Sequence, residues 1–338
     1  MSLQHPTVAI VGATGAVGSE LIGCLERRDF RLDRLRLFAS GRSAGRRLLF
    51  RGQGVEVEEL TEDSFAGIDI ALFSAGGSVS RRFAPIAVRQ GAVVVDNSSA
   101  FRMEPGVPLV VPEVNPAAIG RHIGIIANPN CVAIVAVMAL WPLHRHTPIR
   151  RVVAATYQAA SGAGAAAMEE LRASTAAYLA GSEYAHRVLA HPYAFNLFSH
   201  DTKVDPWSGY NEEETKVMRE LRKIMDEPEL RVGITCVRVP VLRAHSIALT
   251  LEFERPIEPE TARDVLARAA GVRIVDSIAD NHFPMPSEAS GVDEVLVGRI
   301  RRDVSDPSGR SLALFVAGDQ LLKGAALNAV QIAERLVA

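Results

Sequence analysis

A strand-like run that ends in regularly spaced glycines constrains the fold of this chain more than any other feature. Thr7–Val11 is short and unbroken in its apolar character, like strands buried in a parallel sheet. The glycines of Gly12–Gly18 follow at intervals of three, and Ser19–Arg28 then carries a helical pattern. Glycines between a strand and a helix let the backbone approach a pyrophosphate at the helix N-terminus. The arrangement therefore predicts a dinucleotide site, with an ordinary tight turn as the alternative.

The same alternation of strand, loop and helix continues after this motif. Strands are expected at Leu35–Ala39, Asp69–Ala75 and Ala92–Val95, and a helix at Val79–Arg89 separates the last two. Such alternation is typical of a doubly wound parallel sheet, in which ligands bind at the carboxyl ends of the strands. Arg102 follows the last of these strands and is a candidate anion-binding residue, although it could be a surface arginine.

The end of the second strand indicates which dinucleotide is preferred. A site for NAD usually carries an acidic residue there, against the ribose hydroxyls. This chain instead has Arg42 and Ser43, which can hold a 2′-phosphate that a carboxylate would repel. We therefore predict NADP as the cofactor. The alternative is a solvated basic loop that also includes Arg46 and Arg47.

A second junction of this kind surrounds Cys131. The apolar run Ile125–Ala127 ends at Asn128-Pro129-Asn130, which is turn chemistry, and a long apolar helical run begins at once. Asn130 is a good N-cap residue, so Cys131 would open the helix. Unpaired backbone N–H groups and the helix dipole favour a thiolate there, as a nucleophile requires. The alternative is a buried cysteine that serves as a small apolar residue.

The chain changes character after this helix. The segment 182–210 is rich in His, Pro, Asn and aromatic residues, lacks clear periodicity, and so suggests a functional or interface segment. We expect a Rossmann-type domain at residues 1–130, with a C-terminal helix at 318–338 that packs back on it, and a second domain at 131–317. The second domain should contain a mixed sheet with strands at Arg151–Gln158, Val232–Val239, Ser246–Phe253, Glu294–Arg299 and Ser311–Phe315.

Composition excludes several classes of partner. The 338 residues carry a formal net charge of −2, without basic or acidic blocks, so neither nucleic acid nor an anionic membrane is expected as a partner. The three cysteines, Cys24, Cys131 and Cys236, are scattered and form neither a disulfide framework nor a metal-ligand spacing. No signal-peptide layout opens the chain, and we predict a cytoplasmic protein.

Four polar residues in the second half are candidates for a site around Cys131. His245 lies in a short loop between two strands, where it could be a base or a hydrogen-bonded structural histidine. Arg238 lies among apolar neighbours and requires either an internal carboxylate or a substrate carboxylate. Glu213 and Lys216 are one helical turn apart, and the simplest interpretation of that pair is a surface ion pair.

Several longer motifs resemble the aspartate-semialdehyde dehydrogenase family, over essentially the full length of the chain. They are Gly12–Gly18, Asp96–Met103, Val111–Asn115, Asn128–Cys131, Tyr157–Gly164, Arg238–Val241 with His245-Ser246, and Lys323–Val330. The resemblance implies a Rossmann-type domain and a mixed α/β domain that forms a homodimer. It also implies that the enzyme acts on a small-molecule substrate and inorganic phosphate with NADP.

The resemblance further implies a role for each site residue. Cys131 is the nucleophile that forms an acyl-enzyme, His245 is the general acid/base, and Gln158 orients the substrate. The implied substrate-binding residues are Arg238 for the α-carboxylate, Glu213 for the amino group, Arg102 and Lys216 for the phosphate, and Asn130. The implied NADP contacts are Gly12, Thr14, Gly15, Ala16, Val17, Arg42, Ser43, Ser161, Gly162 and Gln320.

The implied reaction is the NADPH-dependent conversion of L-aspartyl 4-phosphate to L-aspartate 4-semialdehyde through a cysteine thioester, in lysine, threonine and methionine biosynthesis. One alternative is N-acetyl-glutamyl-phosphate reductase, although Asn130 precedes the cysteine here where that relative tends to have glycine. Another alternative is a non-catalytic paralogue that serves as a binding protein. Such a chain should lose its nucleophile or base, whereas Cys131 and His245 are both present.

Overall fold

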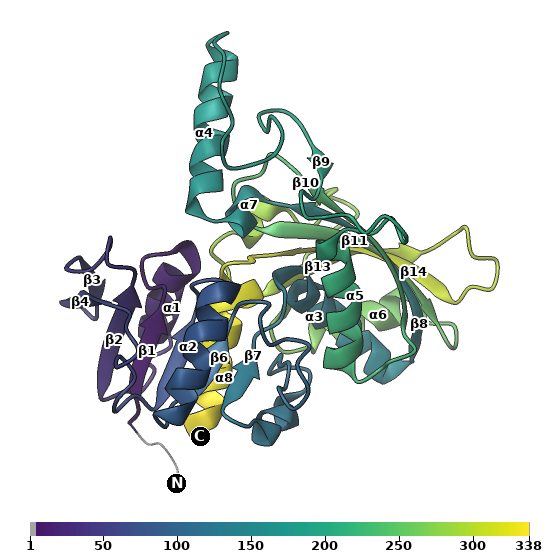
Figure 1. Cartoon of the computed structure of the whole chain (residues 1–338). Helices are drawn as coiled ribbons and strands as arrows, with labels where there is room; N and C mark the ends of the chain where they lie inside the picture. The colour runs from purple at the N-terminus through teal and green to yellow at the C-terminus, as the bar shows by residue number, and fades with distance from the viewer. Residues whose placement is uncertain (1–4, 338) are drawn as a thin grey trace. The chain divides into compact units, whose positions relative to one another are not determined.

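The computed structural model of the chain describes residues 5–337. Among these, residues 5–130 and 325–337 form one compact unit, and residues 131–324 form a second. Each unit contains a seven-stranded sheet, and most of the strands are labelled in Figure 1. The predicted fold class, a Rossmann-type sheet plus a second α+β unit with a mixed sheet, is confirmed.

The first unit is a nearly all-parallel sheet. Its strands are β1 (Thr7–Val11), β2 (Arg34–Ala39), β3 (Arg47–Phe50), β4 (Gln53–Glu59), β5 (Ile70–Phe73), β6 (Val93–Asp96) and β7 (Ile125–Ala127). Its helices are α1 (Ala16–Arg27), α2 (Gly77–Arg89), the 3-10 helix η1 (Pro116–Arg121) and α8 (Leu327–Val337). The strand order is β3-β4-β2-β1-β5-β6-β7, and only β3 and β4 pair antiparallel. The sequence did not predict this edge hairpin.

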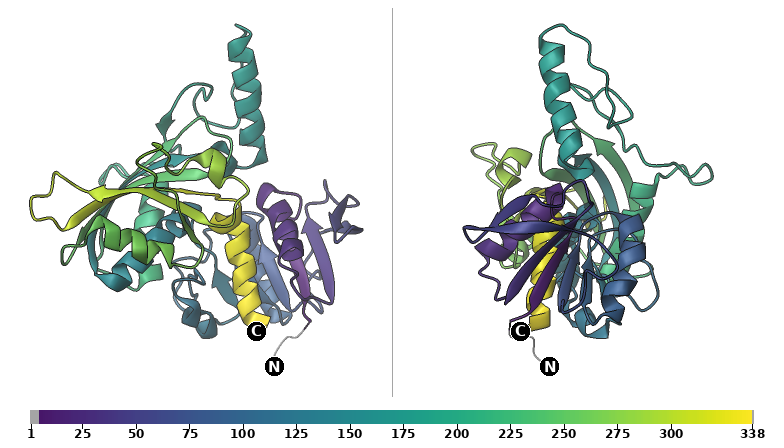
Figure 2. Two further views of the ribbon diagram at one scale, coloured as in Figure 1. Left: turned by 180° about the vertical axis from the view of Figure 1, so that it is seen from behind. Right: turned by 60° about the vertical axis from the view of Figure 1, so that its left-hand side comes forward.

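The order of the strands places a switch point beside β1. The chain leaves β1 in one direction, to β2, and leaves β5 in the other direction, to β6. Right-handed crossovers in opposite directions put their helices on opposite faces of a sheet. Figures 1 and 2, seen from opposite sides, accordingly show α2 over one face and α1 with α8 over the other. The loops after β1 and β5 meet at this point, where doubly wound sheets bind ligands.

The second unit contains a mixed sheet. Its strands are β8 (Ile149–Gln158), β9 (Phe198–Ser199), β10 (Arg231–Arg238), β11 (His245–Phe253), β12 (Val272–Ile274), β13 (Val295–Arg302) and β14 (Ser311–Gly318). Its α-helices are α3 (Cys131–His146), α4 (Ala165–Leu179), α5 (Glu212–Met225), α6 (Pro259–Ala267) and α7 (Pro286–Ala289), and its 3-10 helix is η2 (Ala160–Ala163). The order is β12-β13-β14-β11-β8-β10-β9, with parallel pairing for β8/β10 and β12/β13.

Helices α3, α5 and α6 pack on this second sheet. Helix α3 is apolar all round, and every residue from Val132 to Leu140 is buried, which is the pattern of a core helix. Strand β8 alternates between buried and exposed residues. Val153 and Tyr157 are 40% and 39% exposed, whereas the alternate positions are buried. Apolar side chains therefore remain open to solvent along β8.

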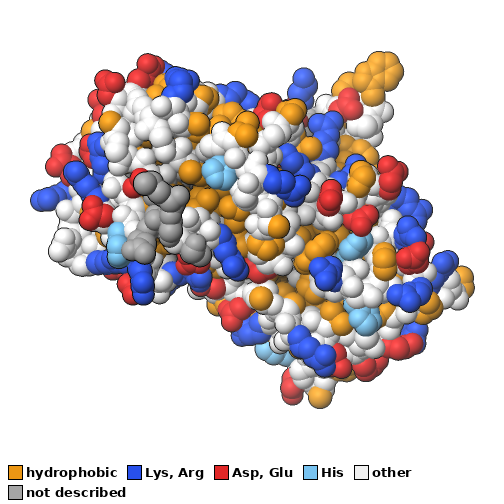
Figure 3. All heavy atoms as spheres, turned by 90° about the horizontal axis from the view of Figure 1, so that it is seen from below, with side chains coloured by type: hydrophobic (Ala, Val, Ile, Leu, Met, Phe, Trp, Pro, Cys, Tyr) orange, Lys and Arg blue, Asp and Glu red, His pale blue; other side chains and the backbone are white. Residues whose placement is uncertain are grey.

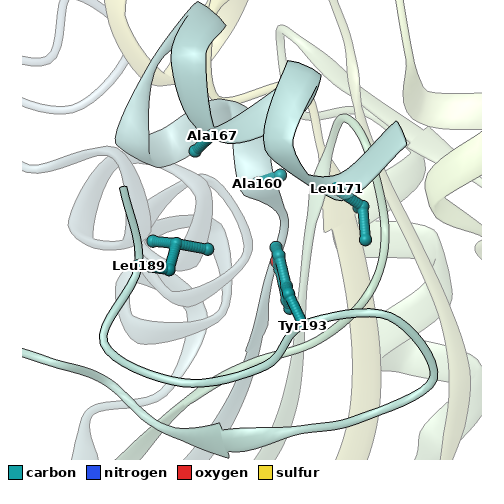
Figure 4. Packing of buried hydrophobic residues seen from close by; sticks show 5 residues of the cluster. All are labelled: Ala160, Ala167, Leu171, Leu189 and Tyr193. Atoms are coloured by element: carbon teal, nitrogen blue, oxygen red, sulfur yellow. The ribbon is translucent and has the colours of Figure 1, made fainter. Parts of the chain in front are cut away.

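The irregular segment 182–210 is fixed to helix α4 by one buried carboxylate. Glu170 accepts backbone N–H bonds from Arg187, Val188 and Leu189 at 2.5, 2.8 and 2.9 Å. A small apolar cluster also joins η2 and α4 to the segment 182–210, as Figure 4 shows. Its members are Ala160, Ala167, Leu171, Leu189 and Tyr193. A segment with almost no regular structure is in this way given a defined position.

The C-terminal return differs from the expected one. A helix was expected at 318–338, but a π-helical turn, η3 (Leu322–Ala326), comes first and α8 begins at Leu327. The chain rejoins the first unit at residue 325, not at 318. Residues 319–324 stay with the second unit because Asp319 is bound there by Arg243 and Gly291.

The surface carries both signs of charge. On the face drawn in Figure 3, acidic and basic side chains are interspersed, in keeping with a net charge of −2. Among the described residues, no helix combines the length and the apolar character that are needed to cross a membrane.

Gly18 should tolerate no side chain. A Cβ there would lie 2.2 Å from Gly12 O and 2.8 Å from the backbone of Ala13. Gly18→Ala should therefore lower the free energy of unfolding by about 2 kcal/mol or more, as overpacking of a rigid site does. Urea denaturation measures this change. Gly120→Ala is the matched control, because no atom lies within 4 Å of its added Cβ; equal midpoints for the two variants would contradict the packing argument.

Candidate active site

Cys131 is the first residue of α3, as the sequence predicted. Its side chain is half-buried, whereas Cys24 and Cys236 are fully buried. Burial raises the pKa of the Cys236 thiol well above its ordinary value, and the acidic side chains of Glu213 and Glu214 add to this. Of the three thiols, only Cys131 combines access to solvent with a position at a helix N-terminus, where a thiolate is favoured.

His245 opens strand β11 and is completely buried. Its Nδ1 accepts the N–H of Ala159 at 3.0 Å, so the neutral ring carries its proton on Nε2. That Nε2 has no hydrogen-bond partner among residues 5–337. The pKa of His245 is lowered well below its usual value, chiefly by burial and then by the charges of Arg238 and His200. The structure thus holds a neutral imidazole with one unsatisfied N–H donor.

Gln158 ends strand β8 and is held from both sides. The Thr156 hydroxyl donates to Gln158 Oε1 at 3.0 Å, and Gln158 Nε2 donates to Glu213 Oε1 at 3.2 Å. Glu213 is buried, and the simple interpretation of a surface Glu213–Lys216 pair is wrong. Lys216 Nζ instead lies 3.8 Å from Glu212 Oε2.

Arg238 ends strand β10 beside Gln158, its register partner on β8. The residue is buried, and its Nε has no hydrogen-bond partner among the described residues. Its Nη1 donates to the Ala159 carbonyl at a long distance, 3.5 Å. The one ion pair of this guanidinium in the described chain is with Asp201, at 3.6 Å. The sequence interpretation missed Asp201, which lies in the irregular segment and carries no periodic signal.

His200 is the second residue that sequence reasoning missed. It is buried next to the same group of charges, and its Nδ1 lies 3.3 Å from Thr202 Oγ1. Burial first, and then the positive charge of Arg238, lower its pKa to about 4, against the opposing effect of Glu213 and Asp201. Its position next to Arg238, Glu213 and Asp201 could not be predicted from the sequence.

Ser161 and Gln320, two predicted NADP contacts, are buried against each other. Gln320 Nε2 donates to Ser161 Oγ, and Gln320 Oε1 accepts the N–H of Ala244 at 2.9 Å. Ala244 has a left-handed backbone (φ +72°) just before His245, so the Gln320 amide helps to hold a strained turn. Gly162 lies against His245, because a Cβ there would be 3.0 Å from the ring atoms Cε1 and Nε2.

Gly324 packs closely against both Cys131 and Gln320. A Cβ at Gly324 would lie 3.1 Å from the Cβ of Cys131 and 3.2 Å from that of Gln320. Within the second unit, the structure therefore brings together most of the predicted catalytic and substrate residues, namely Cys131, Gln158, Glu213, Arg238 and His245, with Ser161, Gly162 and Gln320 beside them. Lys216 lies one turn further along α5 and is partly exposed.

The remaining predicted residues belong to the first unit. Arg102 is buried, and its guanidinium donates to the carbonyls of Asn128 at 3.0 Å and Asn97 at 2.8 Å. These bonds fix its direction. Asn130 is buried at the end of this unit, immediately before Cys131.

The glycine loop meets the requirements of a pyrophosphate site. Gly12 has φ +88°, and its added Cβ would lie 2.6 Å from Ser74 O. Helix α1 begins at Ala16 and Val17 with Gly15 at its N-cap, without a side-chain cap and without an acidic residue in its first turn. Its first N–H groups can therefore receive an anion.

The predicted 2′-phosphate residues lie close to this loop. Thr14 Oγ1 and Ser43 Oγ are 3.5 Å apart, and Arg42 is exposed. The same unit thus offers hydroxyls and a guanidinium, the chemistry that suits a phosphate monoester.

Comparison with known proteins identifies the family. The model described as "Semialdehyde dehydrogenase, NAD binding domain" matches residues 7–122, and "Semialdehyde dehydrogenase, dimerisation domain" matches residues 140–323. The chain is 53% identical over 330 residues to an aspartate-semialdehyde dehydrogenase of Synechocystis sp., with coverage of 98% of this chain and 97% of the relative. The chain belongs to the aspartate-semialdehyde dehydrogenase family.

Solved structures agree with this assignment. Aspartate semialdehyde dehydrogenase II of Vibrio cholerae, in a crystal structure described as complexed with ASA, superposes with a TM-score of 0.95 at 43% identity. It covers 99% of this chain and 98% of its own. An aspartate semialdehyde dehydrogenase of Candida albicans, described as with NADP, has a TM-score of 0.75 at 25% identity and 98% coverage of each chain. The family resemblance predicted from the motifs is confirmed.

One thiol should stand apart from the other two in reactivity. In the folded protein, iodoacetamide should alkylate Cys131, whereas Cys24 and Cys236 should react only after unfolding, because both are buried. Mass spectrometry of the alkylated chain measures the number of modified thiols. Cys131→Ala should abolish the fast modification, and fast labelling that survives in this variant would contradict the assignment.

His200 should make stability depend on pH. Its folded pKa of about 4 lies below the ordinary value of 6.5, so between these values the unfolded chain binds a proton that the folded chain does not. Stability should therefore be complete above pH 6.5 and decline as the pH falls towards 4. Thermal unfolding across this range should show a flatter decline for His200→Gln. The exposed His146→Gln serves as the control, and identical slopes for all three proteins would refute the prediction.

Proposed function

We propose that this chain is an aspartate-semialdehyde dehydrogenase, which converts L-aspartyl 4-phosphate to L-aspartate 4-semialdehyde and inorganic phosphate with NADPH. The observation that carries the proposal is the accessible Cys131 at the start of a buried helix, in the same unit as a neutral His245 with a free Nε2–H. The reaction belongs to the biosynthesis of lysine, threonine and methionine.

Cys131 supplies covalent catalysis. Its thiolate attacks the acyl phosphate carbon, and inorganic phosphate leaves, so that a thioester joins the aspartyl group to the enzyme. The covalent intermediate divides one difficult displacement into two easier steps. The helix N-terminus stabilises the thiolate both before the attack and when the product departs.

His245 acts on the acyl oxygen as a hydrogen-bond donor. NADPH, when bound, supplies the hydride that reduces the thioester. The Nε2–H of His245 donates a hydrogen bond to the acyl oxygen as negative charge develops there, and that charge disappears when the oxyanion collapses to the aldehyde and expels the Cys131 thiolate. A ring that is neutral because of burial can donate this bond, and the hydrogen bond that Nδ1 accepts from the Ala159 N–H holds the proton on Nε2, the required nitrogen.

The charges of the substrate match the basic residues. Arg238, whose Nε has no hydrogen-bond partner in the described chain, binds the α-carboxylate, while Arg102 and Lys216 bind the phosphate. Asn130, next to Cys131, is a further substrate-binding residue. Gln158, fixed by Thr156, orients the acyl group. The resemblance to the family assigns the α-amino group to Glu213.

The first unit supplies most of the cofactor site. Residues Gly12, Thr14, Gly15, Ala16 and Val17 receive the pyrophosphate at the uncapped start of α1. Arg42 and Ser43 bind the 2′-phosphate and so favour NADP over NAD. Ser161, Gly162 and Gln320 are the NADP contacts that the family resemblance assigns to the second unit. The first unit is the NADP-binding domain, and the second is the domain of catalysis and dimerisation.

We also propose a cytoplasmic homodimer. Residues 140–323 match a domain described as a dimerisation domain, and strand β8 presents Val153 and Tyr157 to solvent. Exposed apolar side chains along a strand are the usual mark of a surface that another subunit covers. The three free cysteines suit a reducing compartment.

The test follows NADPH formation in the reverse direction. Aspartate semialdehyde, NADP and phosphate should give a rise in absorbance that requires phosphate, because phosphate must release the acyl group from Cys131. Cys131→Ala should lower the rate by at least roughly 1,000-fold, whereas Cys24→Ala should change it little. Wild-type protein that binds NADP but turns over only the N-acetylated glutamate analogue would instead favour the reductase alternative.

A further inference from the structure

Arg238 and Asp201 form a weak ion pair inside the second unit. Their side chains are 7% and 20% exposed, and the closest atoms, Arg238 Nε and Asp201 Oδ1, are 3.6 Å apart. A charge-assisted hydrogen bond would bring such atoms to about 2.8 Å. The Nε of Arg238 also lacks any other hydrogen-bond partner in the described chain. The two charges therefore attract each other, but they form no hydrogen bond.

The residues on both sides of Asp201 are held by hydrogen bonds. Strand β9 pairs with the end of β10, with Phe198 opposite Arg238, and the N–H of His200 donates to Cys236 O at 2.9 Å. On the other side, Thr202 Oγ1 accepts the N–H of Glu213 at 3.2 Å. Asp201 therefore does not reach Arg238 by chance motion of a surface loop. The fold holds its carboxylate beside the guanidinium.

The neighbouring carboxylate is already engaged. Glu213 Oε1 accepts the amide of Gln158, whose orientation Thr156 sets. Asp201 forms no hydrogen bond of this kind within the described chain, where its contacts are with Arg238 and with His200, at 3.8 Å between His200 Nδ1 and Asp201 Oδ1. Among the described residues, a positively charged ligand group at Asp201 would therefore displace only the loose ion pair with Arg238 and the longer contact with the neutral His200 ring.

The amino-acid end of the proposed substrate carries an ammonium and a carboxylate on a single carbon. A site for it needs an anion and a cation held close together, and the Arg238–Asp201 pair is such an arrangement. We propose that the substrate opens this pair: its α-carboxylate takes Arg238, and its α-ammonium group takes Asp201. The inference rests on the function proposed above, and it adds Asp201 to Glu213 as a group that determines selectivity for a free amine.

Asp201 is then a specificity-determining residue, not a catalytic one. An N-acylated or missing amine brings no positive charge, so a substrate of that kind would leave Asp201 beside Arg238 without its new partner. Sites built to pair with a charged group discriminate strongly against analogues that lack it. The removal of the Asp201 charge should therefore lower the rate with an aldehyde that carries a free amine much more than the rate with an aldehyde that lacks it.

The experiment compares Asp201→Asn with the wild type on two aldehydes, aspartate semialdehyde and succinate semialdehyde, which lacks the amine. The variant keeps the shape of the side chain and removes its charge. For aspartate semialdehyde, kcat/KM should fall roughly 10- to 100-fold, mainly through KM, as the loss of a charge-assisted contact implies. For succinate semialdehyde it should change less than about 3-fold. Asp201→Glu, which keeps the charge, should retain most of the preference.

Asp205→Asn is the matched control. Asp205 lies in the same segment, but among the described residues its carboxylate accepts hydrogen bonds only from the backbone N–H groups of Trp207 and Ser208 and from the Ser208 hydroxyl, so both aldehydes should react as with the wild type. An equal fall for both aldehydes in Asp201→Asn would show a structural counter-ion and overturn the inference, as would an unchanged preference. A wild type that does not turn over aspartate semialdehyde at all would overturn the proposed function, and this inference with it.

Discussion

The register of strands β10, β8 and β11 is the constraint on which the rest of the site depends. Arg238 pairs with Gln158 across β10 and β8, and Ser246 pairs with Tyr157 across β11 and β8, so that β8 and β10 end, and β11 begins, at one edge of the sheet. A slip by one residue would turn each side chain to the other face of the sheet. His245, Gln158 and Arg238 therefore keep their relative positions through backbone hydrogen bonds, which are many and local, and not through contacts among themselves.

The second constraint is the buried positive charge of Arg238, which the surrounding residues compensate only in part. The Arg238 guanidinium, the Glu213 carboxylate and the neutral His200 share one region, yet the closest opposite charge to Arg238 lies at 3.6 Å. A fully satisfied arginine would be more stable and less able to bind a substrate, because a ligand would have to replace good hydrogen bonds. The lowered pKa values of His200 and His245 record the same balance, since both rings stay neutral beside a permanent cation.

Features encoded within a few neighbouring residues could be predicted from the sequence, and features made by distant segments could not. The glycine loop before α1 and the helix that begins at Cys131 are local strand–turn–helix patterns. The start at Cys131 was located correctly, whereas α1 begins at Ala16 and not at Ser19 as expected. The contact of Asp201 with Arg238 joins positions 37 residues apart (238 − 201) through a two-residue strand that no periodicity reveals. The hairpin β3–β4 and the return at residue 325 were missed for related reasons, because short edge strands and a π-helical turn carry weak signals.

The carboxylate of Glu170 has a consequence for the long irregular segment that follows α4. It accepts the three successive backbone N–H groups of residues 187–189. A few residues later, the Tyr193 hydroxyl donates to Val239 O at 2.5 Å. The peptide between Gly181 and His186 therefore only spans two points that are anchored independently. If that exposed span were cut, neither new chain end would be released, and the integrity of this part of the molecule does not depend on an unbroken polypeptide.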